Sequence, residues 1–328
     1  MAERQIVVPD DFPPAYHSAD EANLQELKPY GAVRVDTTRF ADRAEFFSRI
    51  ADAEVVINVR SYSVFDEEAF AHAPKLKMIS ILGTGTDNVD LEAATRHGVV
   101  VTNTPGVGAP SVAELTIGLL LAVARAIPLS HNRVNEGTWQ HIEGPELMGK
   151  TLGLLGIGAI GSRVAKIGQG LGMRVIAWTF NNDPARAAEL GVELVESDEV
   201  FRQADVLSVH LRNSPQARNF VGARELALMK PSAILINTAR AAIVDEDALV
   251  AALREGRLAG AGIDVFLKEP LMPEANPYKE MPNVVLAPHH GAVTVEANAR
   301  SRKMPVDNII AFLEGKPVHV VNPAVLAK

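Results

Sequence analysis

Residues 151–178 read TLGLLGIGAIGSRVAKIGQGLGMRVIAW, which predicts a strand, a turn, a helix and a second strand in succession. The apolar run 152–155 suits a buried parallel strand, and apolar residues at helical spacing lead to a second run at 175–178. Between them stand three glycines at G-x-G-x-x-G spacing: Gly156, Gly158 and Gly161. Glycines so spaced permit a tight turn, a close approach of the backbone to a pyrophosphate, and close packing of helix on strand. Because they follow a strand and open a helix, they predict a dinucleotide-binding loop rather than a ligand-free turn.

The composition is that of a globular protein long enough for two domains, with 328 residues, 47% of them hydrophobic and 22% charged. No apolar run is long enough for a membrane helix, and the first eleven residues lack a signal pattern. The absence of cysteine excludes disulfides, thiolate metal sites and cysteine nucleophiles, and it fits a cytoplasmic protein. We expect no metal site. The net charge of −8 and the lack of a basic stripe argue against a nucleic-acid surface.

Short apolar runs alternate with helical stretches in two parts of the chain. In the first hundred residues the runs are 6–8, 33–35, 55–59, 78–82 and 99–102. From residue 151 onward they are 152–155, 175–178, 206–209, 233–237, 260–264 and 284–286. Such alternation predicts α/β structure with a parallel sheet in each part. A long helix is predicted over 295–313, and residues 318–323 are apolar enough for a last strand or a docking segment.

The chain leaves its first sheet near residue 105, and residues 113–126 then form a helix that is apolar on nearly all sides. Ser111 and Glu114 have the spacing of a capping box at its start. Such a helix is buried in a domain core, between domains, or against a second subunit. The last alternative is the basis for expecting a homodimer, and intradomain burial is its equal rival.

Polar residues that follow three strands of the second sheet define a candidate site: Arg240, Glu269 and His289. In open α/β sheets, ligands bind beyond the carboxyl ends of the strands, so these side chains should converge near the glycine loop. Arginine is a natural clamp for a carboxylate, and histidine beside a carboxylate is a natural proton carrier. A clamp, a proton carrier and a dinucleotide together describe hydride transfer between a 2-hydroxy acid and a 2-keto acid.

Longer motifs over nearly the whole chain resemble the D-isomer-specific 2-hydroxyacid dehydrogenase family, which includes glyoxylate/hydroxypyruvate reductases and phosphoglycerate dehydrogenases. They are GTGTDNVD at 83–90, VAE at 112–114, LMKP at 228–231, INTAR at 236–240, IVD at 243–245, GIDVF at 262–266, EPL at 269–271, and PH at 288–289 with Gly291. The resemblance implies an NAD(P)-dependent dehydrogenase of D-2-hydroxy acids. In it, Arg240 binds the substrate carboxylate and polarises the carbonyl, His289 exchanges the proton, and Glu269 orients His289.

The resemblance also implies the residues of the two binding sites. The cofactor residues would be Thr84, Gly156, Gly158, Ala159, Ile160, Gly161, Thr179, Thr238, Ala239, Asp264 and Gly291. The substrate residues would be Arg60, Ser61, Thr84, Gly85, Arg240 and His289. Among them, Asp264 would contact the nicotinamide carboxamide, and the backbone amides of Thr84 and Gly85 would help to hold the carboxylate. We interpret His290 as a neighbour of the site and His210 as structural.

The family layout implies two doubly wound parallel-sheet domains with a cleft between them. Residues 1–104 and 295–328 would form a smaller, flavodoxin-like substrate domain, and residues 105–294 a Rossmann-type cofactor domain. Closure of a hinge on binding would follow from this layout.

Three positions depart from the family pattern. Dinucleotide folds that prefer NAD end the second strand with an acid that binds the ribose 2′-hydroxyl, and here that position is Thr179. This removes a repulsion against the 2′-phosphate of NADP, but no arginine takes the place of the acid. The cofactor is therefore NAD or NADP, with NAD the commoner in the family. Ala241 stands where the family usually has glycine, and Leu211 where a threonine often contacts the cofactor.

The main alternative from another class is an NAD(H)-sensing, corepressor-like binding protein on the same fold. It would retain the glycine loop, so turnover of a 2-keto acid is the feature that separates the two. Within the enzymes, the formate branch has glutamine where this chain has Glu269. Glyoxylate, hydroxypyruvate, pyruvate and longer keto acids all suit the predicted site, so the sequence leaves the substrate open.

Overall fold

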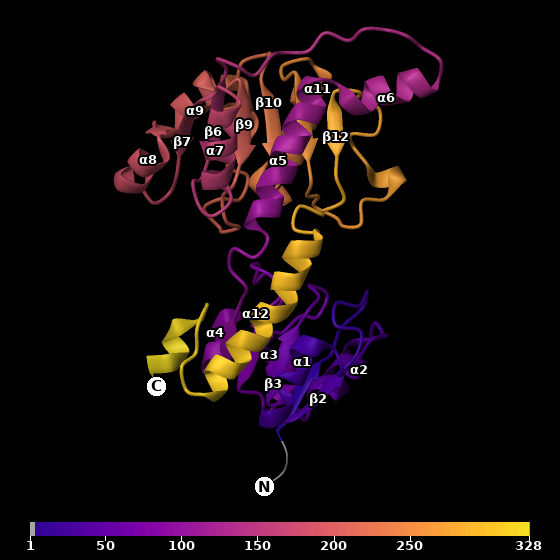
Figure 1. Ribbon diagram of the computed structural model, residues 1–328, viewed down its shortest axis with the longest axis vertical. Coiled ribbons are helices and arrows are strands. Elements are labelled where there is room, and N and C mark those ends of the chain that lie inside the picture. The colour runs from indigo at the N-terminus through magenta and orange to yellow at the C-terminus, as the bar shows by residue number, and fades with distance from the viewer. Residues whose placement is uncertain (1–3, 328) are drawn as a thin grey trace. The chain divides into compact units, whose positions relative to one another are not determined.

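The computed structural model describes residues 4–327 and divides the chain into two compact units (Figure 1). Unit 1 comprises Met1–Val107 and Thr294–Lys328, and unit 2 comprises Gly108–Val293. The expected boundaries lay at 104/105 and 294/295; the structural division lies at 107/108 and 293/294. One unit is thus built from both ends of the chain, and the other from its middle.

Unit 1 contains a parallel five-stranded sheet in the order β2-β1-β3-β4-β5. The strands are β1 (Gln5–Val8), β2 (Ala32–Val35), β3 (Val55–Asn58), β4 (Met78–Ile81) and β5 (Val100–Thr102). The helices are α1 (Ala22–Gln25), α2 (Arg43–Ile50), α3 (Glu67–His72), α4 (Leu91–Arg96) and α12 (Val295–Leu313). This is the flavodoxin-like order, in which the direction of winding reverses between β1 and β3. The five strands and the long helix agree with the sequence expectation.

Helix starts and core packing in unit 1 follow from its sequence. Asp42, Asp66 and Asp90 each accept hydrogen bonds from backbone amides of the first turn of α2, α3 and α4, which fixes where these helices begin. Apolar side chains cover both faces of the sheet, and α12 packs on one of them through Val306 and Ile309. The tail docks on β5, where the Asn322 side chain hydrogen-bonds to backbone and side-chain atoms of unit 1.

Unit 2 contains a parallel seven-stranded sheet in the order β12-β11-β10-β9-β6-β7-β8. The strands are β6 (Thr151–Leu155), β7 (Arg174–Trp178), β8 (Glu193–Leu194), β9 (Val206–Val209), β10 (Ile234–Asn237), β11 (Gly260–Ile263) and β12 (Val284–Leu286). The helices are α5 (Ala109–Ala124), α6 (Ile127–Asn135), α7 (Gly161–Gly170), α8 (Pro184–Leu190), α9 (Ser197–Gln203), α10 (Ala223–Leu228) and α11 (Glu246–Arg254). The order is that of a doubly wound dinucleotide-binding fold. The short edge strand β8 was not predicted.

Helix α5 corrects one expectation and agrees with one of the alternatives that the sequence left open. It begins at Ala109 with Pro110 in its first turn, so Ser111 lies inside the helix and the predicted capping box is wrong. Proline is tolerated in the first turn of a helix because its missing N–H needs no partner there. The helix packs against β10, β11 and α7, and Leu119 and Leu120 lie in the core of unit 2. Intradomain burial therefore explains its apolar surface without a second subunit.

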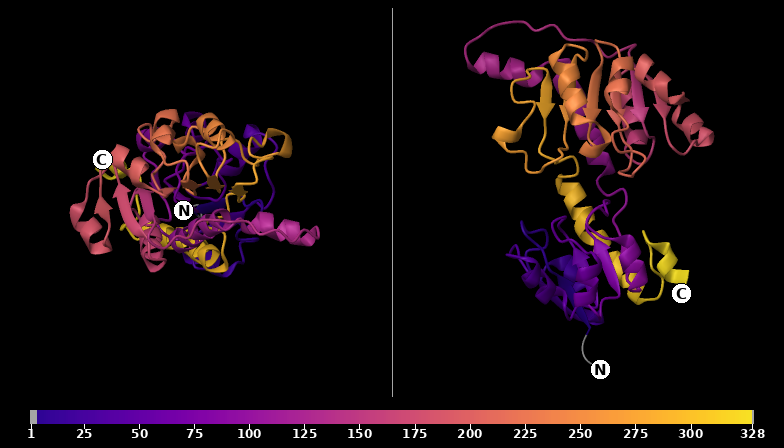
Figure 2. Two further views of the ribbon diagram at one scale, coloured as in Figure 1. Left: turned by 90° about the horizontal axis from the view of Figure 1, so that it is seen from above. Right: turned by 180° about the vertical axis from the view of Figure 1, so that it is seen from behind.

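Helix α6 and the segment after it extend from the body of unit 2 (Figures 1 and 2). Among the described residues, no single helix is long and apolar enough to cross a membrane; α5 and α6 meet such a criterion only together, and they are bent by 59°.

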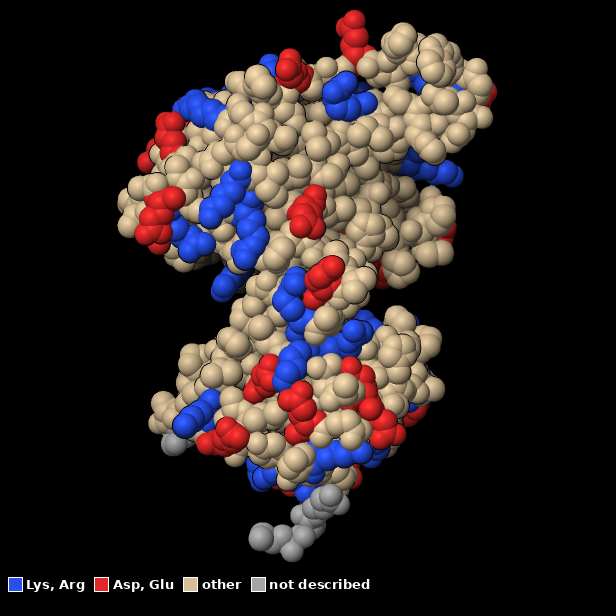
Figure 3. Space-filling view, in the orientation of Figure 1, with Lys and Arg blue, Asp and Glu red and all other residues tan. Residues whose placement is uncertain are grey.

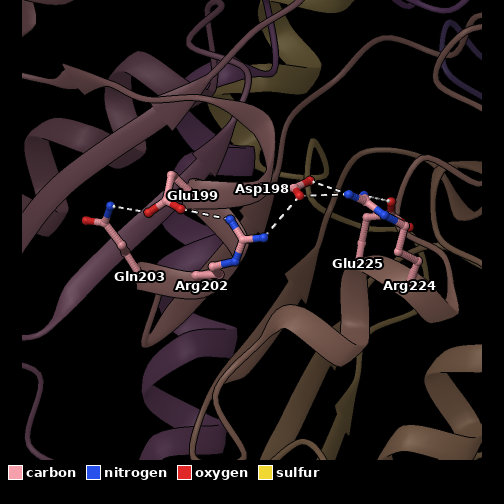
Figure 4. Close-up of polar contacts among 6 residues, drawn as sticks. All are labelled: Asp198, Glu199, Arg202, Gln203, Arg224 and Glu225. Atoms are coloured by element: carbon pink, nitrogen blue, oxygen red, sulfur yellow. Dashed lines mark hydrogen bonds and ion pairs between the residues drawn. The ribbon is translucent and has the colours of Figure 1, made fainter.

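Charged side chains join α9 to α10 at the surface of unit 2 (Figure 4). Asp198 accepts hydrogen bonds from Arg224 at 2.7 Å and Arg202 at 3.2 Å. Glu199 and Glu225 accept from the same two arginines, each at 2.8 Å. Lys, Arg, Asp and Glu side chains are scattered over the visible face of each unit, and other residues form most of that face (Figure 3). Because water screens such exposed pairs, they contribute little to stability.

Candidate active site

The three motif glycines of the loop after β6 differ in the space that surrounds them. Gly156 has φ +98°, and a Cβ atom there would lie 2.9 Å from the carbonyl oxygen of His210. A Cβ atom on Gly161 would overlap the carbonyl oxygen of Gly156. A Cβ atom on Gly158 would meet nothing within 4 Å. Two glycines are therefore required by the packing of the protein itself, whereas Gly158 faces open space.

Helix α7 starts directly after this loop. Ile160 occupies the N-cap position and makes no side-chain capping bond, and Ala159 and Gly158 before it are exposed. An uncapped helix start presents backbone N–H groups and the positive end of the helix dipole. The loop and the helix start thus have the shape and the charge to hold a dinucleotide.

The end of β7 carries no carboxylate, and arginine side chains lie close to the glycine loop. Thr179 follows Trp178, as expected. Arg186 Nε donates a hydrogen bond of 3.0 Å to the carbonyl oxygen of Ile157, and Arg163 Nη1 donates one of 2.6 Å to that of Ala159. The sequence pattern missed Arg186 because it lies seven residues beyond Thr179, on α8.

Aromatic side chains surround the same strand end. The Trp178 ring stacks on Phe220, with centroids 4.6 Å apart, and meets the Phe180 ring edge-on at 4.8 Å. His210, at the end of β9, hydrogen-bonds through Nε2 to Ser208 Oγ at 2.9 Å. Its Nδ1 atom is buried without a partner, and burial lowers the pKa of His210 to about 3. A neutral imidazole packed in this way agrees with the structural role expected for His210.

A buried turn after β10 holds Arg240. Asn237 Oδ1 accepts a hydrogen bond of 3.0 Å from the Ala239 amide, and Asn237 Nδ2 donates one of 3.1 Å to the carbonyl oxygen of Arg240. Thr238 is fixed from the other side, because its hydroxyl lies 2.8 Å from that of Thr116 on α5. The Arg240 side chain is partly exposed, and its Nη1 donates to the carbonyl oxygen of Ala239 at 2.8 Å. Asn237 has no role in the sequence motifs considered above, and its two hydrogen bonds shape the turn.

The side chains of His289 and Glu269 are in direct contact. His289 Nδ1 lies 2.7 Å from Glu269 Oε2, while Glu269 Oε1 accepts a hydrogen bond of 3.0 Å from the Phe266 amide. Since Nδ1 faces the carboxylate, Nε2 is the nitrogen available to a substrate. His289 has φ +52°, in the left-handed region that few residues other than glycine, asparagine, aspartate and histidine adopt. An unusual backbone conformation at such a residue is often found in functional sites.

Asp264 supports the loop that carries His289. Its side chain is buried, its Oδ1 accepts from the His290 amide and its Oδ2 from the Gly291 amide, each at 3.0 Å. Burial raises the pKa of the Asp264 carboxyl. A Cβ atom on Gly291 would lie 3.0 Å from Asp264 Oδ2, so a larger residue would disturb this contact. The structure therefore adds a loop-fixing contact to the cofactor role expected for Asp264.

Three neighbouring strands bring these residues to one edge of the sheet. β10, β11 and β12 are adjacent and parallel, with Asn237 paired to Ile263 and Ile263 to Leu286 at their ends. Arg240, Glu269 and His289 all follow these ends, as the sequence predicts. Among the described residues, no group of His, Asp or Glu side chains is arranged to hold a metal ion.

The candidate substrate loops of unit 1 follow β3 and β4. The Arg60 guanidinium donates to the carbonyl oxygen of Pro13, and Ser61 is exposed. Thr84 is exposed; its hydroxyl donates to the carbonyl oxygen of Thr104 at 3.2 Å, and Gly85 follows it in the same loop. Both loops therefore lie at the carboxyl edge of their sheet, where ligands bind in such folds.

Known proteins resemble the chain over most of its length. Residues 117–291 match the NAD binding domain of the D-isomer specific 2-hydroxyacid dehydrogenase family. The glyoxylate reductase of Aeropyrum pernix is 44% identical over 80% of this chain and 81% of the relative. The D-3-phosphoglycerate dehydrogenase of Methanocaldococcus jannaschii is 39% identical over 90% of this chain but 56% of the relative. A glyoxylate reductase structure from Paecilomyes thermophila has a TM-score of 0.89 and 28% identity, covering 98% of this chain and 99% of that one.

These matches confirm the resemblance carried by the sequence motifs, and the fold has the two parallel sheets that the resemblance implies. The chain therefore belongs to the D-isomer specific 2-hydroxyacid dehydrogenase family and is an oxidoreductase with a nicotinamide-cofactor domain.

Proposed function

We propose that the protein reduces a small 2-keto acid, glyoxylate foremost, to the D-2-hydroxy acid or its achiral counterpart. The observation that carries this proposal is the 2.7 Å contact between His289 Nδ1 and Glu269 Oε2 beside the strand end that bears Arg240. The relative of highest identity named above is a glyoxylate reductase matched over most of both chains. Unit 2 would bind the cofactor and unit 1 would supply substrate contacts.

The roles of the three polar residues follow from their chemistry. When bound, the nicotinamide ring supplies the hydride for reduction and accepts it in oxidation. Arg240 binds the carboxylate of the acid through two parallel hydrogen bonds and polarises the adjacent carbonyl. The protonated ring of His289 gives its Nε2 proton to the carbonyl oxygen, which becomes the alcohol. Glu269 holds Nδ1–H of His289, so that Nε2 points to the substrate throughout.

The remaining binding residues are proposed residue by residue. We assign the backbone amides of Thr84 and Gly85 as additional donors to the carboxylate, and Arg60 and Ser61 as the loop that shapes substrate choice. On the cofactor, Gly158, Ala159 and Ile160 would face the pyrophosphate. The remaining proposed cofactor contacts are Thr84, Thr179, Thr238, Ala239, Asp264 and Gly291. The first and third glycines of the loop, Gly156 and Gly161, would act by shaping it.

The direct test of this function is coenzyme oxidation with a panel of 2-keto acids. We expect oxidation of NADH or NADPH by the wild-type protein with glyoxylate, hydroxypyruvate or pyruvate, followed at the nicotinamide absorbance band. Tight coenzyme binding without turnover on any acid would contradict the proposal and favour the corepressor-like sensor.

The NAD and NADP alternatives differ at the ribose. We propose that NADPH is used at least as well as NADH, because Thr179 adds no negative charge and Arg186 is held beside the glycine loop by its bond to Ile157. Replacing Thr179 by aspartate is then expected to lower kcat/KM for NADPH about tenfold or more, since a carboxylate repels the 2′-phosphate, and to preserve or improve use of NADH. Steady-state rates with each coenzyme measure the ratio. An unchanged ratio would contradict this assignment.

We propose a homodimer formed through α6 and the segment that follows it. Several large apolar side chains of this region are exposed: Ile127 at 52%, Val134 at 54%, Trp139 at 83% and Met148 at 70%. Several exposed apolar side chains along one segment are typical of an association surface. The sequence indicated α5 as the basis for a dimer, and the support proposed here comes from α6 and the segment after it instead.

Charges placed on α6 and the segment after it should separate the subunits. We expect wild-type protein to sediment as a dimer and the double variant Val134→Glu, Trp139→Glu to sediment as a monomer, because burying two carboxylates in an apolar interface is strongly unfavourable. Sedimentation velocity measures both, and Val64→Glu, an exposed apolar residue of unit 1, is the control. A monomeric wild type, or a double variant that stays dimeric, would refute the assignment.

A further inference from the structure

A buried carboxylate lies directly behind the loop that carries Arg60. Asp10 follows β1 and is fully buried. Its Oδ1 accepts a hydrogen bond of 3.1 Å from the Val59 amide, and its Oδ2 accepts from the Arg60 amide at 2.9 Å and from Asn58 Nδ2 at 3.1 Å. Burial raises the pKa of Asp10 to about 6. This carboxylate therefore fixes the backbone at the first residues beyond β3.

Asn58 links Asp10 to Asn88, which follows the second substrate strand β4. Its Oδ1 accepts a hydrogen bond of 2.9 Å from Asn88 Nδ2. The same Asn88 nitrogen lies 2.7 Å from the carbonyl oxygen of Ser63 and 3.3 Å from that of Arg60. Since Asn88 lies three residues after Gly85, one set of side chains spans residues 59–63 and 83–88.

The other end of the second loop has its own anchors. Asn103 Nδ2 donates a hydrogen bond of 2.7 Å to the carbonyl oxygen of Thr84, and the Gly83 amide donates one of 2.8 Å to Thr104 Oγ1. These bonds tie Thr84 to the end of β5. The loop is thus held toward β5 at one end and toward β3 at the other, and Asn88 forms the attachment toward β3.

A polar side chain at the position of Asn58 is unusual. Asn58 is 1% exposed and is the last residue of β3, whose other residues are all apolar and buried. A buried amide and a buried carboxylate are unfavourable unless their hydrogen bonds are satisfied, and they specify one arrangement when they are. Asp10, Asn58 and Asn88 bond to one another and to backbone atoms of the loops, which is the pattern of a positioning network.

We propose that Asp10, Asn58 and Asn88 form a positioning network that sets the spacing of the two substrate loops, 59–63 and 83–88. The proposal rests on the proposed function, because these loops bind substrate only if the protein acts on a 2-keto acid. The three residues act through Arg60, Thr84 and Gly85 and do not themselves touch the reacting atoms.

Asn322 offers a matched control for Asn58. Each is a buried asparagine of unit 1 whose side chain makes three hydrogen bonds: those of Asn322 join the Val101 amide, the Thr95 hydroxyl and the Val99 carbonyl, none of which belongs to either substrate loop. Replacing either by alanine removes the same groups and leaves a similar void. Comparable losses of stability are therefore expected from both.

The two variants should differ in kinetics and in hydrogen exchange. We expect Asn58→Ala to raise KM for the keto acid about tenfold or more and to leave KM for the coenzyme within a factor of two, whereas Asn322→Ala changes neither beyond that factor. Amide exchange should quicken in both 59–63 and 83–88 in Asn58→Ala alone. If Asn58→Ala does not fold, Asn88→Ala, which removes the network from its half-buried end, is measured in the same way.

The possible outcomes bear on two separate claims, the positioning network and the proposed function. Equal kinetic constants and equal exchange in the Asn58 and Asn322 variants would overturn the network, as would faster exchange confined to residues 59–63. Absence of turnover by the wild type on every acid would instead overturn the proposed function, and the exchange of the two loops would still decide whether the network couples them.

Discussion

Replacing His289 by asparagine is expected to lower kcat for keto-acid reduction about 10³-fold, with little change in coenzyme affinity. A positioned general acid contributes roughly 10²- to 10⁴-fold to rate, and asparagine cannot deliver the Nε2 proton. Asparagine is the informative replacement because it also adopts the left-handed backbone, here φ +52°, and so preserves the loop. Steady-state kinetics and coenzyme titration measure the two effects.

His290→Asn is the matched control, because it makes the same change one residue further on and retains the backbone amide that Asp264 binds. Its kcat should stay close to that of the wild type. A His289→Asn variant that kept kcat within tenfold of the wild type would show that another group delivers the proton.

Replacing Arg240 by lysine is expected to lower kcat/KM for the keto acid about 10³-fold. Lysine keeps the positive charge but lacks the planar fork that donates two parallel hydrogen bonds to a carboxylate. Loss of such a pair costs roughly 2–5 kcal/mol, and the change also removes the group that polarises the carbonyl. The rate should fall further with alanine, while NADH or NADPH binding, followed by fluorescence, remains.

Arg254→Lys, at the last residue of α11, is the control for a general effect of the substitution. If Arg240→Lys turned over the acid with nearly wild-type kcat/KM, the carboxylate would have to be bound elsewhere, and Thr84 and Gly85 would be the first residues to examine.

Much of the fold could be predicted because its signals are local. Buried parallel strands appear as short apolar runs, and the runs at 152–155 and 206–209 correspond closely to β6 and β9. The contact of His289 with Glu269 could also be predicted, since residues that follow adjacent parallel strands meet at one edge of the sheet. These inferences need only periodicity and topology.

Other features depend on contacts that no local pattern reports. The two-residue strand β8 is too short to leave a periodic signal. Helix α5 begins at Ala109, ahead of the apparent capping box, with Pro110 in its first turn. The bonds of Asn237 and Asp264 to the backbone of their neighbouring loops require the side-chain geometry. Asn58 was overlooked for the same reason, because a single amide within the apolar run 55–59 has no sequence signature.

The central claim is that this chain transfers hydride to the carbonyl carbon of a 2-keto acid. The most direct measurement uses reduced coenzyme that carries deuterium at both hydrogen positions of C4 of the nicotinamide ring and detects the product by mass spectrometry. We predict a 2-hydroxy acid one mass unit heavier, labelled at C2, formed by the wild type and nearly absent with His289→Asn. Product without label, or no product in the presence of bound coenzyme, would contradict the claim.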